Sequence, residues 1–154
     1  MTSAKKEALL ITVFAMVAIG IWTDNAVAQS ISPAPFTQAQ SDAGRETYVT
    51  SCASCHGDGL EGKGSPALAG KAFIASNFGQ HTVAELYNFI QKSMPFCDGG
   101  TLAAESYTDI VAFILEANGA KSGDQPLTPA ASVKVSDIAT GDMPAGFLSG
   151  VTPK

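Results

Sequence analysis

Five consecutive residues, Cys52-Ala53-Ser54-Cys55-His56, restrict what this chain can fold into more than any other part of its sequence. Two thiols separated by two residues and followed at once by an imidazole form the pattern through which proteins attach haem covalently. The two sulfurs can add to the two vinyl groups of one haem, and the adjacent histidine then lies beneath the iron. The pattern therefore predicts a chain wrapped around one haem c, attached at Cys52 and Cys55 and ligated by His56.

Other uses of the cysteine pair stay open at this stage. A C-x-x-C pair can be a redox dithiol or a structural disulfide, which would make the chain a binding protein without haem. A closed zinc site needs four ligands, and the other candidates, His81 and Cys97, are irregularly spaced. Cys97 makes the number of cysteines odd, so a pure disulfide framework would leave one thiol over. We expect Cys97 to be a small buried side chain, with a solvent-exposed thiol or an intermolecular disulfide as the alternatives.

The first 28 residues have the pattern of a secretory signal peptide. Lys5 and Lys6 precede an apolar run from Ala8 to Trp22, and Ala26-Val27-Ala28 supplies the small residues of a cleavage site. The run is shorter than the roughly 20 residues that span a bilayer. We therefore expect cleavage near Ala28, export to the periplasm and no stable membrane span, with a retained anchor as the alternative.

The charge of the exported chain narrows the class of partner. Two basic and two acidic residues leave with the signal peptide, so the formal net charge stays at −5. An acidic surface argues against nucleic acid and against anionic lipid, and it favours a protein partner.

The mature chain divides into an extended leader, a helical domain and a tail. Residues 29–40 contain Pro33 and Pro35 and predict the extended leader. Residues 41–120 predict the domain. Residues 121–154 contain four prolines and predict a tail that packs on the domain or trails from it.

Three helices are expected within the domain. The first is capped by Ser41 and runs toward Cys52, and the second begins at the capping box Thr82-Val83-Ala84-Glu85 and ends near Pro95. The third runs from about Ala103 to the stop signal Asn118-Gly119. The glycine-rich residues 57–80 predict loop, and residues 133–138 predict a short strand or turn. Loops longer than about 12–15 residues are uncommon in a compact domain unless they have something to pack on. A flat apolar cofactor would supply that surface.

Together these features resemble the class I c-type cytochromes that carry a single haem, over roughly residues 41–120. Gly44 and Tyr48 resemble the small and aromatic residues of that family's first helix, across which the last helix passes closely. The matching positions on the last helix are Tyr107, Ala112 and Phe113. The resemblance implies an all-α cytochrome c fold, with three main helices and long loops wrapped around one covalent haem c.

The resemblance also implies further site residues. Gly64 to Gly70 is similar to the family loop in which a proline carbonyl accepts the proton of the ligand histidine and a leucine lies on the haem, which here are Pro66 and Leu68. Chemistry agrees, since a metal-bound histidine needs an acceptor that fixes its tautomer. Met94 stands where the family places its methionine ligand.

Two other side chains compete with Met94 for the sixth position on the iron. Met143 lies in the tail, beyond the last expected helix, and the chain pattern favours Met94 over it. His81 comes just before the second helix and is better read as a solvated loop histidine.

Over residues 82–119 the chain resembles a more specific group, the cytochrome domains associated with periplasmic quinoprotein dehydrogenases. It implies a periplasmic electron carrier that is not itself an enzyme, although it could be the cytochrome subunit of a dehydrogenase complex. Such a carrier takes electrons from a periplasmic dehydrogenase and passes them to an oxidase or another cytochrome. Ligation by histidine and methionine raises the iron potential relative to two histidines and leaves no open site for a substrate. If Met94 does not ligate, the alternative is a haem enzyme or gas sensor with an open sixth position.

Lys63, Lys71 and Lys92 fall in haem-flanking segments and are predicted to guide docking.

Overall fold

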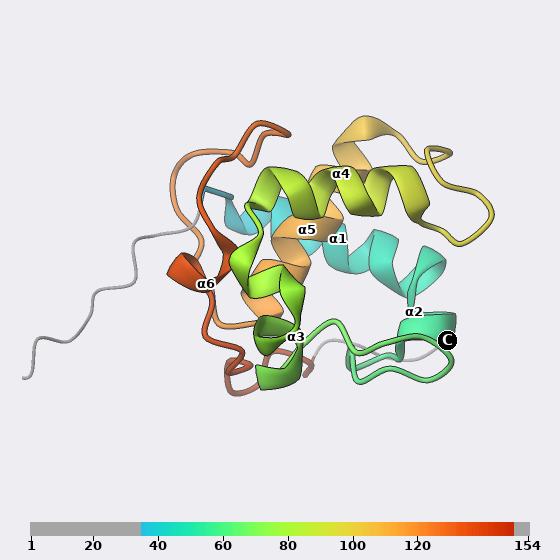
Figure 1. The fold of residues 1–154 in the computed structure, drawn as a ribbon, viewed down its shortest axis with the longest axis horizontal. Helices are drawn as coiled ribbons and strands as arrows, with labels where there is room; N and C mark the ends of the chain where they lie inside the picture. Colours follow the sequence, from blue (N-terminus) through green and yellow to red (C-terminus); the bar gives the residue numbers. More distant parts are fainter. Residues whose placement is uncertain (1–34, 150–154) are drawn as a thin grey trace, which may run out of the picture.

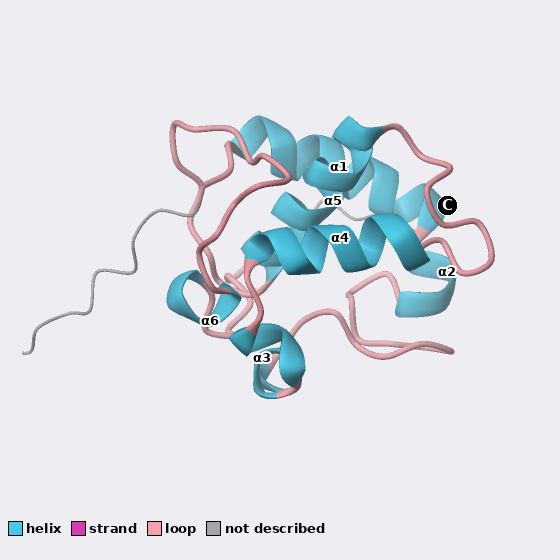
Figure 2. Ribbon diagram, turned by 45° about the horizontal axis from the view of Figure 1, so that its top comes forward, coloured by secondary structure: helices cyan, strands magenta, loops and turns pink. Residues whose placement is uncertain are grey.

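The computed structural model describes residues 35–149, apart from the side chain of Asn77 (Figure 1). The predicted signal peptide, most of the predicted leader and the last five residues lie outside that range. All the regular elements within it are helical (Figure 2). They are α1 (Gln38–Ser51), α2 (Ala53–His56), α3 (Lys71–Ala75), the 3-10 helix η1 (Asn77–Gln80), α4 (Val83–Ser93), α5 (Ala104–Ala117) and α6 (Val135–Ile138). The all-α prediction is therefore confirmed.

Helices α1 and α5 cross closely at the centre of the core (Figure 1). A Cβ atom added to Gly44 would lie 1.9 Å from the carbonyl oxygen of Asp109, so only glycine allows this approach. One turn further along α1, the ring of Tyr48 packs against that of Phe113, with the ring centroids 5.1 Å apart. The crossing expected from Gly44 and Tyr48 is confirmed, and it fixes the end of α1, from which the C-x-x-C-H segment continues.

Helix α4 begins as the sequence predicts. The hydroxyl of Thr82 accepts a hydrogen bond from the backbone N–H of Glu85, and the Glu85 carboxylate accepts one from the backbone N–H of Thr82. These hydrogen bonds lower the pKa of Glu85, because they stabilise the charged carboxylate. Leu86 and Ile90 are buried on the core side of the helix. The helix ends at Met94, which forms its C-cap.

The first helix begins four residues earlier than expected, so the prediction of Ser41 as its cap is wrong. Thr37 is the N-cap and Gln40 completes a second capping box. Ser41 lies inside the helix, buried, with its hydroxyl on the carboxylate of Glu116. Threonine followed three residues later by glutamine satisfies two backbone N–H groups, which a lone serine cannot do. Residues 38–40 of the predicted leader 29–40 belong to α1, and residues 29–34 lie outside the described part of the chain.

The glycine-rich segment is also more ordered than predicted. Residues 57–80 contain α3 and η1, because Phe73 and Phe78 anchor these short helices by stacking with ring centroids 5.2 Å apart. Residues 135–138 form one turn of helix rather than a strand, and the side chains of its first and last residues, Val135 and Ile138, are buried. In both places a few buried apolar side chains outweigh the loop signals of the local sequence.

The tail packs on the domain instead of trailing from it. Leu127 and Phe147 are buried, and the guanidinium of Arg45 lies 5.0 Å from the centre of the Phe147 ring. Backbone N–H groups at the start of α4 donate to the tail, from Val83 to Val133 at 2.9 Å and from Ala84 to Ala131 at 2.8 Å. Across residues 35–149, none of the helices has both the length and the apolar content needed to cross a membrane.

Candidate haem site

One turn of helix gathers the three residues of the predicted attachment motif. Cys52 ends α1 and caps α2, and its carbonyl accepts the N–H groups of Cys55 at 3.1 Å and His56 at 3.0 Å. Cys52 is half-buried, Cys55 is exposed and His56 is buried. The three cysteines of the described chain are free thiols. Both sulfurs and the imidazole therefore leave the same short helix, as attachment to one flat group requires.

The imidazole of His56 is held by the loop that follows it. Its Nδ1 lies 2.8 Å from the carbonyl oxygen of Pro66. A carbonyl oxygen can only accept a hydrogen bond, so Nδ1 carries the proton and Nε2 keeps its lone pair for a metal. The contact expected between these two residues is present, and it fixes the orientation of the imidazole.

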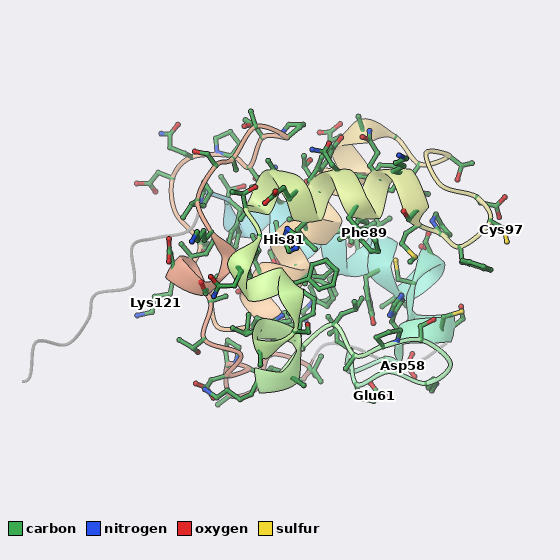
Figure 3. The ribbon with its side chains drawn as sticks, in the orientation of Figure 1. Asp58, Glu61, His81, Phe89, Cys97 and Lys121 are labelled. Atoms are coloured by element: carbon green, nitrogen blue, oxygen red, sulfur yellow. The ribbon has the colours of Figure 1, made fainter. Side chains whose placement is uncertain are left out.

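The same loop is fastened to the motif at several further points. The carbonyl of Cys55 accepts the N–H groups of three successive residues, Lys63, Gly64 and Ser65, at 3.0–3.1 Å. The hydroxyl of Tyr48 donates to the carbonyl of Gly57 at 2.7 Å. Figure 3 shows this loop, with Asp58 and Glu61, beside α2. The Pro66 carbonyl thus belongs to a braced segment and not to a free one.

Cys52 packs against the apolar core, whereas Cys55 is exposed. Burial raises the pKa of the Cys52 thiol to about 11, with the Cys55 thiol adding to the effect. Burial also raises the pKa of Tyr48, with Cys52 as the next cause. A neutral, poorly solvated environment suits thioether bonds and the apolar body of a haem better than it suits a reactive thiolate.

A cleft of about 400 Å³ opens between η1 and α4. It is lined by Phe78, His81, Glu85, Asn88 and Phe89. Phe89 is 48% exposed there, although its ring packs edge-on against Phe78 with centroids 5.5 Å apart. Figure 3 shows His81 and Phe89 on the side of α4 that faces α3. The aromatic walls of the cleft suit a flat apolar ring, although Glu85 adds a carboxylate to its lining. The donor set of the motif fits a haem, because two thiols and an imidazole leave one short helix and Nδ1 of that imidazole already has an acceptor.

The two methionine candidates occupy different parts of the fold. Met94 is half-buried at the end of α4, where its N–H donates to Ile90 at 2.8 Å and its carbonyl accepts the hydroxyl of Tyr107 at 3.0 Å. Met143 is also half-buried, but it lies in the tail beside Asp142, which pairs with α3 through Lys71. Met94 is thus fixed from two sides at the position the chain pattern indicated.

The structure also places the other candidate site residues, His81, Leu68 and Cys97. His81 is exposed, with Nδ1 3.4 Å from the Glu85 carboxylate, as expected of a solvated histidine. Leu68 is half-buried against the core. Cys97 is exposed, so the prediction of a buried side chain is wrong. Its φ of 72° places it in a left-handed turn between the exposed residues Phe96 and Asp98, and that turn keeps its side chain at the surface.

Sequence reasoning missed two contacts that shape the site. The Tyr107 hydroxyl on the Met94 carbonyl joins residues 13 positions apart, and no local pattern signals it. Asn118 was read only as a helix stop, yet its amide bonds the backbone of the loop after Pro66. A fully buried asparagine at the end of a helix is the one signal that could have suggested such a role.

Two of the three lysines predicted to guide docking are already paired. Lys63 lies 3.4 Å from Asp58, and Lys71 lies 2.6 Å from Asp142. Each pair brings a carboxylate beside the ammonium, so these positions add little net positive charge to the surface. The expected basic rim is accordingly weaker than the sequence suggested.

The chain is similar to known proteins that carry related domains. The family described as "Cytochrome C oxidase, cbb3-type, subunit III" matches residues 39–114. A curated relative, the thiosulfate dehydrogenase of Stutzerimonas stutzeri (strain A1501), is 31% identical over 77 residues, which are 46% of this chain and 25% of that protein. The chain thus spans about a quarter of the length of that relative. The sulfane dehydrogenase SoxCD from Paracoccus pantotrophus is 24% identical with a TM-score of 0.45, over 81% of this chain and 65% of that one.

The family match identifies the class of cofactor. A disulfide-bearing protein without haem is excluded, because the domain family is one of covalent haem proteins. Electron transfer is the general function of such domains. Residues 39–114 therefore form a c-type cytochrome domain, and its cofactor is a covalently bound haem c.

Proposed function

We propose that this cytochrome is an exported one-electron carrier, with haem attached at Cys52 and Cys55 and ligated by His56 and Met94. The observation that carries the proposal is the 2.8 Å contact between His56 Nδ1 and the Pro66 carbonyl. It fixes the direction of the imidazole and makes Nε2 a stronger donor, which is what a permanent axial ligand needs. When bound, the haem supplies an iron that accepts and releases one electron.

The chain's own residues hold and shield that group. Cys52 and Cys55 would attach the haem covalently, and Leu68, half-buried against the core, would help to exclude water from it. Met94 is held at its N–H by Ile90 and at its carbonyl by Tyr107, so its side chain can approach from a fixed backbone. With both axial positions taken by protein, no site remains for a substrate, and the proposal is a carrier rather than an enzyme.

The proposed partners are a dehydrogenase as electron donor and an oxidase or another cytochrome as acceptor, all in the periplasm. Two observations support this. The curated relative is named as a dehydrogenase, and the first 28 residues have the pattern of a signal peptide. The proposed docking surface is the exposed loop after Met94, where Phe96 is 82% exposed, and the paired lysines Lys63 and Lys71 add little charge elsewhere.

The ligand assignment is tested by replacing each methionine in the haem-loaded protein. Met94→Ala should remove the sulfur-to-iron absorption band and lower the reduction potential, because thioether sulfur favours reduced iron. Met143→Ala is the matched control and should leave both unchanged. The reverse result would move the ligand into the tail. A wild-type protein that binds carbon monoxide rapidly would instead support the enzyme or sensor class. Co-purification from the periplasm would then identify the donor.

A further inference from the structure

Asn118, at the end of α5, connects the helix to the loop that carries Pro66. Its side chain is fully buried. Its Oδ1 accepts the backbone N–H of Gly70 at 3.0 Å, and its Nδ2 donates to the carbonyl of Leu68 at 2.9 Å and to that of Ile114 at 2.8 Å. One amide group therefore satisfies the backbone of the loop from both directions and anchors it to α5.

The tail fastens the same point from the other side. The backbone carbonyl of Asn118 accepts the N–H groups of Thr140 at 3.0 Å and Gly141 at 2.9 Å. Gly141 lies directly against Gly70, since a Cβ atom added to it would meet backbone atoms of Gly70 at 2.9 Å. The ammonium of Lys71 adds a hydrogen bond to the carbonyl of Thr140 at 3.2 Å. Residues 140–142 thus close over the end of the loop.

This junction lies two residues from the carbonyl that holds the histidine. Leu68, whose carbonyl Asn118 binds, donates its own N–H to Leu60 at 2.9 Å, and Pro66 lies on the short stretch before it. The near end of the loop is fixed independently, by the N–H of Gly62 on the carbonyl of His56 at 2.7 Å. The Pro66 carbonyl is therefore restrained from both ends, before it by Ser65 on the Cys55 carbonyl and after it by residues 68–70, which Asn118 holds.

We propose that Asn118 is a positioning residue for His56, and that the tail at Thr140 and Gly141 acts with it. Together they hold residues 68–70 so that the Pro66 carbonyl stays on Nδ1 of His56, and through that hydrogen bond they help to set the iron's reduction potential. The inference rests on the proposed function in one respect, namely that His56 ligates the iron. It assigns a role to residues 118 and 140–141, which lie beyond the segment 39–114 that matches the family.

The expected direction follows from the chemistry of imidazole. A carbonyl that accepts the Nδ1 proton makes the ring more basic and favours oxidised iron. If the loop shifts and this hydrogen bond weakens, His56 becomes a poorer donor and the potential becomes more positive. The Nδ1 proton also exchanges with solvent more readily, because a protected hydrogen bond opens more often.

Two variants disturb the junction from opposite sides, and each has a matched control. Asn118→Ala removes the amide, and Gly141→Ala pushes a methyl group against Gly70. Thr108→Val is the control for the first, since Thr108 is a buried polar residue of the same helix whose hydroxyl donates only to Glu105. Gly146→Ala is the control for the second. Gly146 has φ of 75° against 80° for Gly141, but its nearest neighbour would be Ser149 Oγ at 3.7 Å.

The experiment measures the reduction potential and the exchange of the His56 Nδ1 proton by NMR in the haem-loaded proteins. Asn118→Ala and Gly141→Ala should both make the potential more positive and speed the exchange about tenfold, the effect of one weakened buried hydrogen bond. Both controls should lower the melting temperature without moving either quantity.

The outcomes separate this inference from the proposed function. If wild type shows a histidine-ligated iron but both junction variants leave potential and exchange at wild-type values, the positioning role is wrong and the carrier function stands. If wild type shows no ligation by His56, both fail together. Should Asn118→Ala not fold, Gly141→Ala decides the question alone, because it retains every hydrogen bond of the Asn118 side chain.

Discussion

The two sides of the proposed haem site, one at His56 and one at Met94, are held in different ways. On the His56 side, the loop after the motif is fastened by contacts from α1, α5 and the tail, including those of Tyr48 and Asn118. On the Met94 side, the chain beyond the helix end bonds mainly to itself, as in the contact of Asp98 N–H with the Pro95 carbonyl at 2.8 Å. Phe96 is 82% exposed there, and Figure 3 shows Cys97 at the outer edge of the molecule.

This difference suggests a division of labour between the sides. The His56 side depends on many distant residues, so it stays fixed and sets the properties of the iron. The Met94 side depends on the end of α4 and on one tyrosine, which leaves a surface loop free to meet another protein. Loops on a rigid scaffold commonly carry recognition. Each prediction below tests one part of that contrast.

The largest effect should come from removing the attachment points. Cys52→Ala/Cys55→Ala should carry no covalent haem, whereas Cys52→Ala alone should keep at most one thioether bond. The double variant should also fold poorly, because residues 57–80 lose the surface on which they pack. Denaturing gel electrophoresis with haem staining reports the bonds, and circular dichroism reports the fold. A double variant with wild-type thermal stability would show that the His56 side is braced by protein alone.

A smaller but still severe effect is expected at the helix crossing that both sides share. In Gly44→Ala the new methyl carbon would meet the Asp109 carbonyl, so α1 and α5 must move apart. Overpacking of this kind costs roughly 2–3 kcal/mol, which is a fall of about 10 °C or more in melting temperature for a domain of this size. Gly64→Ala is the control, since nothing lies within 4 Å of its added carbon. Equal losses in the two variants would contradict the close crossing.

Two tyrosines allow the sides to be compared directly. Tyr107→Phe removes the hydroxyl from the Met94 carbonyl, and Tyr48→Phe removes the hydroxyl from the Gly57 carbonyl. Each loss of a partly or fully buried hydrogen bond should cost about 1–2 kcal/mol in unfolding free energy. Only Tyr107→Phe should let added imidazole displace Met94 more readily, because the Met94 side has few other restraints. Absorption titration with imidazole measures this. If Tyr48→Phe weakens the sixth ligand as much, the sides are not independent.

The sequence also predicts the residues of the two sides to different extents. Cys52, Cys55 and His56 are recognised locally, since covalent attachment demands that spacing, and Gly44 with Tyr48 predicts the helix crossing. The contacts that hold Pro66 come from residues 118 and 140–141, and no local period links them to position 66. Cys97 was misjudged because burial depends on the turn around it. The cap at Thr37 was missed because two capping signals stand four residues apart and tertiary packing selects between them.

The smallest effect concerns docking, and it tests which side meets the partner. Lys92 stands in the last turn of α4 on the Met94 side, while Lys63 stands on the His56 side, paired with Asp58. Because Phe96 is exposed beside Met94, we expect the donor to dock there. Lys92→Gln should slow the bimolecular electron-transfer rate about twofold at low salt, the size typical of one exposed charge, and Lys63→Gln should slow it less.

The measurement is the rate with the native donor as a function of ionic strength, since salt screens exposed charges beyond about 8–10 Å. The wild-type rate should fall only slightly with salt, because Lys63 and Lys71 are offset by carboxylates. Asp58→Asn/Lys63→Gln removes one pair without changing the net charge and should match wild type. A larger effect from Lys63→Gln than from Lys92→Gln would place the partner on the His56 side. In that case the exposed loop after Met94 would not be the docking surface, and its exposure would need another explanation.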